Sequence, residues 1–390
     1  MGNIKRTDII AYLWPIYFWK VIFLKPLFYI FSDIPSVYIA GGFLAFILLG
    51  VFLFLYQQRR LIYVNNGHLF LIIIIFLFIL NFLFNMNENM FNYFYNFILL
   101  VLPTLLILAY VKDYGLLIRN FYLLSIIAIL IYGPWHFFNN DLFANYMDFG
   151  FSIALPAMIG IFLYRKNSQL KWVFVIEIFA MFMLVVFANR SALLAIILMY
   201  LSYPLLFKKQ NTKIFFKYLI SAAIITLIIL VNYKILFTFL LEFINLFDIS
   251  SYSLQKYSNL IFEVDDARVL SGRDIIWQNA INEINTNPFG YGVGGFEEKY
   301  DGYSHNFVLD MILYWGFFGF CLFFILLTFS MKKFISLKKS PEKLLIFIFF
   351  ISSFPKLFFS SVFLNDISFF SFFMVIFILS KFRLKKEFGK

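Results

Sequence analysis

The stretch HLFLIIIIFLFILNFLF at residues 68–84 decides the class of fold, because it is apolar except for His68 and Asn81 and holds no Lys, Arg, Asp or Glu. A helix that crosses a membrane needs about 20 mostly apolar residues. Similar stretches recur along the 390 residues, which are 63% hydrophobic and 14% charged. Soluble domains are about 45–50% apolar and about 25% charged. We therefore expect a multi-pass membrane protein.

These apolar runs predict an all-α fold with about twelve transmembrane helices, in a single membrane domain that covers residues 1–390. In lipid every backbone N–H and C=O group must be paired, and a helix pairs them within itself. The first run could instead lie in the membrane interface, because Lys20 and Lys25 interrupt it. The predicted spans are residues 9–31, 36–56, 68–84, 94–111, 120–135, 149–164, 172–188, 190–207, 214–237, 306–330, 343–362 and 366–380.

The basic residues predict the orientation of these spans. If the amino terminus is cytoplasmic and the spans alternate, 23 of the 32 Lys and Arg residues fall on the cytoplasmic side. Cytoplasmic loops are rich in Lys and Arg, so both termini are expected in the cytoplasm. The net charge of +11 then reflects membrane orientation, and no nucleic-acid partner is expected. The basic residues on the outer side are Arg190, Lys234, Lys256, Arg268, Arg273, Lys299 and Lys356.

One connection, residues 238–305, is far longer than the others and is predicted to form a large loop on the outer face. Long connections in compact proteins are usually functional. Within the loop, Ser271 and Asp274 have the spacing of a capping box, and apolar residues at helical spacing follow as far as Pro288. We expect an amphipathic helix at the outer interface or on the tops of the spans, with Trp277 as its anchor.

Four glycines between residues 290 and 295 follow this helix, and such a stretch must turn sharply or approach another segment closely. Three arginines on the outer side are candidates for an anion site. Arg190 lies in a tight turn between two spans, where it could equally anchor a lipid phosphate. Arg268 and Arg273 flank the start of the loop helix, whose free N–H groups favour anions. Salt bridges to neighbouring acids are the alternative for these two.

His305 and Asn306 lie where the long loop returns to the membrane, so His305 could face the same site as the arginines. The other histidines, His68 and His136, are too far from it in sequence to form a metal motif, and Cys321 is the single cysteine. No metal and no cofactor are therefore expected. Nucleotide-binding and hydrolase motifs are also absent from the sequence.

Five of these features, in their order, resemble the O-antigen polymerase and ligase superfamily over roughly residues 180–325. They are Asn189-Arg190-Ser191, Ser271-Gly272-Arg273 with Trp277, Asn287-Pro288-Phe289-Gly290-Tyr291-Gly292, His305-Asn306, and Gly316 to Gly319. The resemblance implies a fold like that of the C-type glycosyltransferases. It implies that the protein lies in the inner membrane of a bacterium. It also implies a metal-independent, inverting transferase that acts on undecaprenyl-diphosphate-linked oligosaccharide at the periplasmic face.

The resemblance assigns roles to particular residues. Arg190 and Arg273 would neutralise the diphosphate that leaves, and His305 would lie beside it as a donor or proton shuttle. Arg268, Asn306, Trp277 and Asp301 would contact the substrate. The general base stays open, and its candidates are Asp301, Glu297, Glu298, Asp310 and His305 itself. A polysaccharide chain-length regulator is an expected partner.

Three functions remain open on the sequence. A repeat-unit polymerase is favoured, because the chain is idiosyncratic outside the motifs, as expected when an enzyme fits its own repeat unit. A ligase that transfers the glycan to lipid A-core shares the same landmarks. A transporter or flippase for lipid-linked oligosaccharide would also have about twelve spans. Against it, the two halves are unlike, and Glu177 is the main charged residue within a predicted span.

Overall fold

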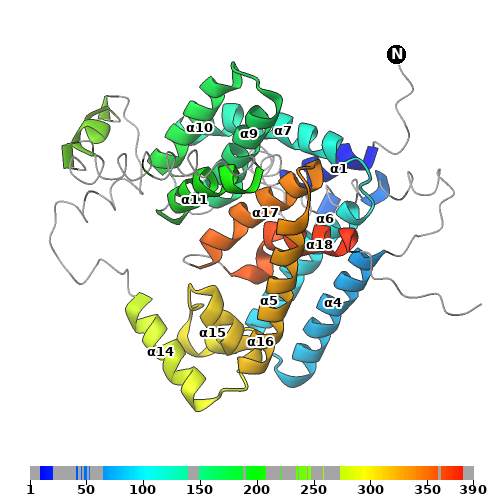
Figure 1. The fold of residues 1–390 in the computed structure, drawn as a ribbon. Coiled ribbons are helices and arrows are strands. Elements are labelled where there is room, and N and C mark those ends of the chain that lie inside the picture. The colour runs from blue at the N-terminus through cyan, green and yellow to red at the C-terminus, as the bar shows by residue number, and fades with distance from the viewer. Residues whose placement is uncertain are drawn as a thin grey trace, which may run out of the picture.

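The computed structural model describes residues 9–20, 65–138, 149–187, 190–207, 273–358 and 362–380, with isolated positions between 41 and 52 and between 220 and 258. All regular elements in these residues are helices, as predicted (Figure 1). They are α1 Ile9–Phe18, α4 Asn66–Phe84, α5 Glu88–Asn96, η1 Phe97–Val101, α6 Leu102–Ala109, α7 Tyr114–Phe138, η3 Phe149–Ala154, α9 Leu155–Ser168, α10 Val173–Phe187, α11 Arg190–Phe207, α14 Arg273–Thr286, α15 Gly295–Tyr300, α16 Phe307–Ser336, α17 Pro341–Leu357, η5 Phe363–Asn365 and α18 Ile367–Leu379.

Within the described residues, five helical stretches are long and apolar enough to cross a membrane. Each overlaps a predicted span, and α10, α11 and α18 are shorter apolar helices at further predicted positions. Another helix, α17, overlaps the predicted span 343–362. The chain is therefore a multi-pass membrane protein. The predicted spans 36–56 and 214–237 lie largely outside the described residues, as does the second half of 9–31. The five stretches are Asn66–Leu83, Glu88–Ala109, Tyr114–Ile131, Phe149–Ser168 and Phe307–Ser336.

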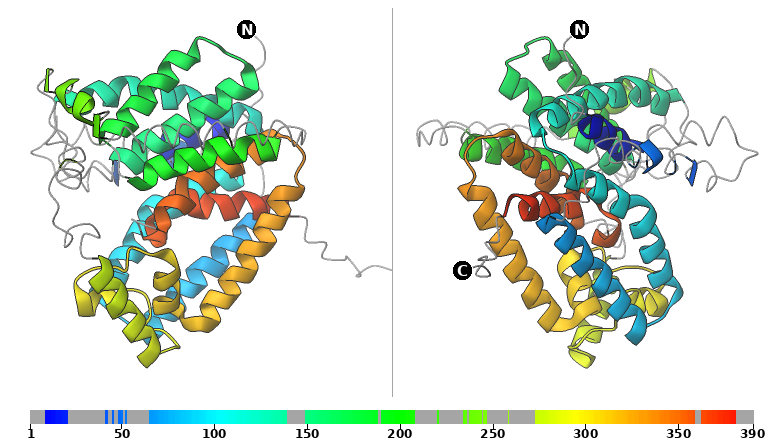
Figure 2. Two further views of the ribbon diagram at one scale, coloured as in Figure 1. Left: turned by 60° about the vertical axis from the view of Figure 1, so that its left-hand side comes forward. Right: turned by 90° about the vertical axis from the view of Figure 1, so that its right-hand side faces the viewer.

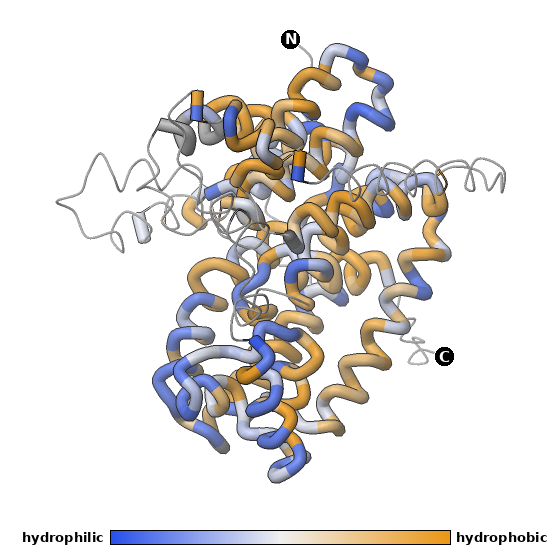
Figure 3. The backbone as a smooth tube through the Cα atoms, turned by 90° about the vertical axis from the view of Figure 1, so that its left-hand side faces the viewer, coloured by the Kyte–Doolittle hydropathy of each residue, from blue (hydrophilic) through white to orange (hydrophobic). Residues whose placement is uncertain are grey.

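At the centre of the helix bundle, α18 packs against α17, α4 and α6 (Figure 2). Aromatic rings make many of the contacts there. The rings of α18 are almost completely buried, and Phe369 alone contacts Phe354, Phe363 and Phe373 with ring centroids 5.1–5.7 Å apart. Polar residues gather instead at the end of the molecule that holds α14 and α15 (Figure 3). This end is the one that the sequence predicts to be the outer face.

The first described helix, α1, packs against α6 and α7, and most of its residues are buried, whereas Tyr12 is exposed. Side chains of α1, and of Lys20 just after it, donate hydrogen bonds to backbone carbonyl groups of residues 99–104. In this part of the chain the regular helix is interrupted, because η1 is a π-helix and Pro103 has no N–H to donate. The carbonyl groups left unpaired would be costly in lipid. The indole of Trp14 donates to Thr104 O (3.0 Å), the hydroxyl of Tyr17 to Leu99 O (2.7 Å) and Nζ of Lys20 to Leu100 O (2.9 Å).

The charge within the predicted seventh span is paired inside the protein. Glu177 of α10 is buried and forms an ion pair with Arg165 of α9. Its second oxygen accepts a hydrogen bond from the hydroxyl of Tyr200 in α11, at 2.8 Å. Glu177 thus connects three helices. Pairing of this kind is the usual condition for a carboxylate at membrane depth.

The predicted span 306–330 is wrong in one respect, because its helix is broken at Gly316. Gly316 has φ 66° and ψ −176°, which no residue of a continuous helix adopts. The rings of Phe307 and Phe323 lie 5.1 Å apart, whereas 16 residues of straight helix would separate them by about 24 Å. The chain therefore folds back at Gly316. Residues 317–336 alone form a helix of about 30 Å, enough to cross the membrane.

The glycine-rich stretch explains why the chain can fold back there. Tyr291 N donates to Leu313 O (2.6 Å) and Phe317 N donates to Pro288 O (3.1 Å), so the two backbones touch. A Cβ atom on Gly316 would lie 2.6 Å from the carbonyl group of Phe289. Only glycine fits this contact, and the predicted close approach of the glycine-rich stretch is confirmed.

Replacement of Gly316 by alanine is expected to destabilise the protein by more than about 1 kcal/mol, because the new Cβ meets backbone and the positive φ is strained. Gly302→Ala is the matched control, since a Cβ there meets nothing within 4 Å. The melting temperatures of the detergent-purified variants, monitored by size-exclusion chromatography after heating, test this expected loss of stability. Equal melting temperatures for the two variants would contradict the close approach.

Candidate functional site

The candidate site lies at the polar end of the molecule, where α14, α15 and the start of α16 meet the turn between α4 and α5 (Figure 1). Three asparagines near this turn hold the glycine-rich stretch in place. Asn81 Oδ1 accepts from Val293 N (3.0 Å), Asn87 Nδ2 donates to Val293 O (2.9 Å) and Asn85 Nδ2 donates to Tyr291 O. The three side chains thus pair backbone N–H and C=O groups of the glycine-rich stretch, which is not part of a helix or a sheet.

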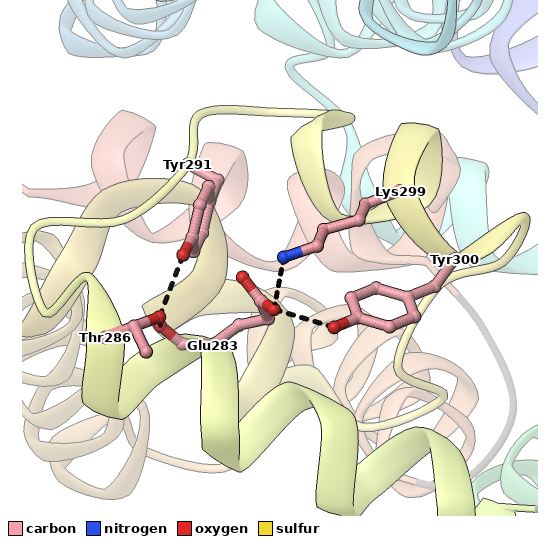
Figure 4. A network of polar contacts seen from close by, with 5 residues as sticks. All are labelled: Glu283, Thr286, Tyr291, Lys299 and Tyr300. Carbon is pink, nitrogen blue, oxygen red and sulfur yellow. Dashed lines mark hydrogen bonds and ion pairs between the residues drawn. The ribbon is translucent and has the colours of Figure 1, made fainter.

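A second set of contacts fixes α14 against α15 (Figure 4). Glu283 is buried, and its Oε1 atom accepts from Lys299 Nζ and from the hydroxyl of Tyr300, both at 2.6 Å. These hydrogen bonds lower the pKa of Glu283 to about 2, so the group is ionised at neutral pH. The hydroxyl of Tyr291 lies 3.0 Å from that of Thr286. The contacts tie the loop helix to the segment that leads to His305.

His305 has a backbone conformation that few residues adopt, with φ 56°. Its neighbour Ser304 is fixed on three sides. Trp277 Nε1 donates to Ser304 O (2.8 Å), and Asp310 Oδ1 accepts from the hydroxyl (2.6 Å) and the N–H (3.2 Å) of Ser304. Asn306 then begins α16, since its side chain accepts from Val308 N and Leu309 N. The loop is therefore held rigidly around His305.

The imidazole of His305 is half-buried beside the ring of Tyr303, with centroids 4.1 Å apart, and its Nδ1 atom has no hydrogen-bond partner among the described residues. Burial lowers its pKa to about 4, and the positive charge of Arg273 acts in the same direction. His305 is thus neutral at physiological pH. A neutral imidazole can accept a proton, and an anion placed between it and Arg273 would raise its pKa.

Two buried carboxyl groups lie behind this loop, Glu297 of α15 and Asp310 of α16. Glu297 Oε1 accepts from the hydroxyls of Tyr93 (3.1 Å) and Tyr314. The other oxygen of each acid, Glu297 Oε2 and Asp310 Oδ2, is buried without a hydrogen-bond partner in the described part of the chain. Burial raises the pKa of Glu297 and so favours its neutral form.

The remaining sequence-predicted residues are placed as follows. Arg273 begins α14, and its positive charge is the smaller of the two causes that lower the pKa of His305. The backbone of Arg190 begins α11. Asp301 is exposed and ends α15 with a positive φ. Arg268 lies outside the described residues, as does Ser271 of the predicted capping box.

Several residues of the site could not be identified from the sequence alone. Asn81, Asn85 and Asn87 lie about 200 positions away from the stretch that they bind, in a region that reads only as a span end. Tyr93 and Tyr314 are two of 24 tyrosines in an aromatic-rich chain. Among the described residues, no three His, Cys, Asp or Glu side chains are grouped so that they could hold a metal ion.

Comparison with protein families gives one match over this region. Residues 158–324 match the family model described as O-antigen ligase. The matched range runs from α9 into α16 and contains Arg190, Arg273 and His305. No curated protein and no solved structure matches significantly.

The low pKa of His305 predicts a dependence of stability on pH. Because the folded-state value of about 4 lies below the ordinary value of about 6.5, the unfolded chain binds more protons between these two values. Stability should therefore fall by roughly 1–2 kcal/mol as the pH falls from about 6.5 to about 4. Melting of wild type and His305→Gln across this range tests the prediction. Parallel pH profiles for the two proteins would contradict it.

Proposed function

Because residues 158–324 carry a domain of the O-antigen ligase family, whose members transfer lipid-linked glycans, we propose that the chain is a repeat-unit polymerase. It transfers the growing glycan of an O-antigen, capsule or exopolysaccharide from undecaprenyl diphosphate onto a new lipid-linked repeat unit. The observation that carries the proposal is the hydrogen-bonded loop that holds His305, within the matched range that also contains Arg273.

The proposed topology has twelve spans, with both termini in the cytoplasm of a bacterial cell and the site at the periplasmic face of the inner membrane. Two observations support it. The polar end of the molecule coincides with the predicted outer loop (Figure 3). Most of the Lys and Arg residues, 23 of 32, fall on the opposite side when the predicted spans alternate.

In the proposed reaction the acceptor hydroxyl attacks the anomeric carbon of the donor from the face opposite to the diphosphate. The bond from that carbon to the diphosphate oxygen breaks, and its electron pair leaves with the diphosphate. Inversion follows from this single displacement. Arg190 and Arg273 neutralise the leaving group, the role that fixed cations and donors play wherever charge develops in a transition state. No metal ion or cofactor takes part in this scheme.

We assign the proton of the acceptor hydroxyl to His305. Its neutral state and its free Nδ1 atom support this role, because a base must be unprotonated before the reaction. The arrival of the anionic diphosphate beside Arg273 would raise the pKa of His305 at the moment when a base is needed. Asp310 and Trp277 act through Ser304 and are positioning residues in this scheme.

The substrate contacts are assigned to residues around this loop. Trp277 and Asn306 shape it directly through their hydrogen bonds. Arg268 and Asp301 are proposed to contact the glycan or the diphosphate, Asp301 from an exposed position. The other partners of the reaction are the surrounding lipid and a polysaccharide chain-length regulator.

The second candidate is an O-antigen ligase that transfers the glycan to lipid A-core. The description of the matched family favours it, and both reactions require the same anionic leaving group. A transporter is less well supported, since Glu177, the main charge in mid-span, is already paired with Arg165 and Tyr200.

Replacement of Arg190, Arg273 or His305 by alanine is expected to lower transfer at least ~100-fold, because each loss removes charge or proton stabilisation from the transition state. Arg273→Lys should also be poor, since an ammonium group cannot bind two phosphate oxygens at once. Lys338→Ala is the control, an exposed cation beyond the carboxyl-terminal end of α16. Product formation and membrane expression are measured together. Normal transfer by all three alanine variants at normal expression would refute the site.

Surface polysaccharide from a deletion strain distinguishes the candidate functions. Lipid A-core that carries a single repeat unit is expected for a polymerase and should be restored to a ladder by wild type but not by Arg273→Ala. Loss of all capping with accumulation of lipid-linked polymer would instead establish the ligase. An unchanged ladder would exclude both and favour the transporter.

A further inference from the structure

Lys356, the penultimate residue of α17, is a cation that the proposed reaction does not use. Its Nζ atom lies 2.5 Å from Asp366 Oδ2, and the side chains are 13% and 1% exposed. The Nζ atom also lies 5.7 Å from the centre of the Phe151 ring of η3. The sequence places Lys356 among the outer-face basic residues.

The end of α17 that carries Lys356 adjoins the His305 loop. Lys356 lies between Phe354 and Phe358 in sequence, and both of these rings contact Phe307, with centroids 6.4 and 6.0 Å apart. Phe307 is the first residue of α16, two positions after His305. The last turn of α17 therefore lies against the start of α16, where the His305 loop ends.

The same end of α17 also adjoins the start of α11. Phe207, the last residue of α11, contacts Phe347 and lies under Lys343 near the beginning of α17, so the two helices run antiparallel (Figure 2). Arg190, at the other end of α11, thus lies at the end of α17 that carries Lys356. The η3 segment supports this placement. Its Phe149 packs on Phe187, three residues before Arg190, while its Phe151 packs on Lys356.

Stability alone does not explain the pair of Lys356 with Asp366. Asp366 Oδ1 caps α18 by accepting from Phe369 N at 2.7 Å, but an asparagine caps a helix equally well. Buried ion pairs add little net stability over uncharged residues of similar size. Asp366 is held by its helix, whereas the ammonium group of Lys356 is carried on a flexible stem of four carbons. The three N–H donors of this ammonium group therefore allow it to bind a second anion while it stays paired with Asp366.

The chemistry of the donor supplies such an anion. A diphosphate esterified at both ends carries about two negative charges, and the diphosphate that leaves carries about three at neutral pH. Arg190 and Arg273 balance the first two. We propose that Lys356, while it remains paired with Asp366, also donates to the leaving diphosphate and balances the third charge as it develops. This inference rests on the proposed function, since it requires a diphosphate to leave at this site.

A cation that binds only the developing charge should raise kcat and leave KM for the donor almost unchanged. The double variant Lys356→Met/Asp366→Asn tests this with little risk to folding, because no unpaired charge remains and the asparagine introduced before α18 can still cap that helix. We expect its melting temperature to stay near that of wild type and its kcat to fall about 100-fold. Lys343→Met, at the opposite end of α17, is the matched control and should keep its kcat.

Exchange of the two charges, by Lys356→Asp together with Asp366→Lys, tests whether the ion pair only stabilises the fold or whether the reaction needs a cation at position 356. The exchange also removes the acceptor that caps α18, so the melting temperature is measured together with kcat. In folded protein we expect the low kcat to persist, because the cation then lies at position 366, just before α18. Full recovery of kcat would overturn the inference, as would a double neutral variant with normal kcat or with a loss seen only in KM. If wild type itself transfers no glycan from the diphosphate donor, the proposed function fails as well.

Discussion

The contact of the glycine-rich stretch with the break at Gly316 is the constraint on which the outer half of the structure depends. It turns the chain back after residues 307–315, a segment in which Tyr314 binds Glu297 and Asp310 binds Ser304 next to His305. Without this reversal, residues 307–336 would form one long span. The polar network would then have no element on which to form.

Polar groups at several points within the bundle are paired by residues of other helices. The side chains of α1 pair the carbonyl groups around the π-helix, and Arg165 and Tyr200 pair Glu177. Three of the unpaired groups among the described residues are informative. The buried atoms Glu297 Oε2, Asp310 Oδ2 and His305 Nδ1, which have no hydrogen-bond partner among the described residues, belong to the candidate site. Unsatisfied groups cost stability and persist where function requires them.

The sequence allows most helices to be predicted, because apolar length is a local property that lipid enforces. The helix before Pro288 and the close approach of the glycines were predictable because helical periodicity, proline and glycine are local features of the sequence. The asparagines that hold the glycine stretch, and the partner of Lys356, were not predictable from one sequence. They depend on contacts between segments about 10 to 200 residues apart, which periodicity does not encode. The break at Gly316 was missed because the residues on both sides are apolar.

The most direct test of this account is chain growth by the purified full-length protein in vesicles, supplied with an undecaprenyl-diphosphate-linked repeat unit. We predict lipid-linked glycans of increasing length and one released undecaprenyl diphosphate for each linkage formed, with neither product from His305→Ala. A wild-type protein that leaves the repeat unit unchanged would contradict the polymerase, and growth that persists in His305→Ala would contradict the site.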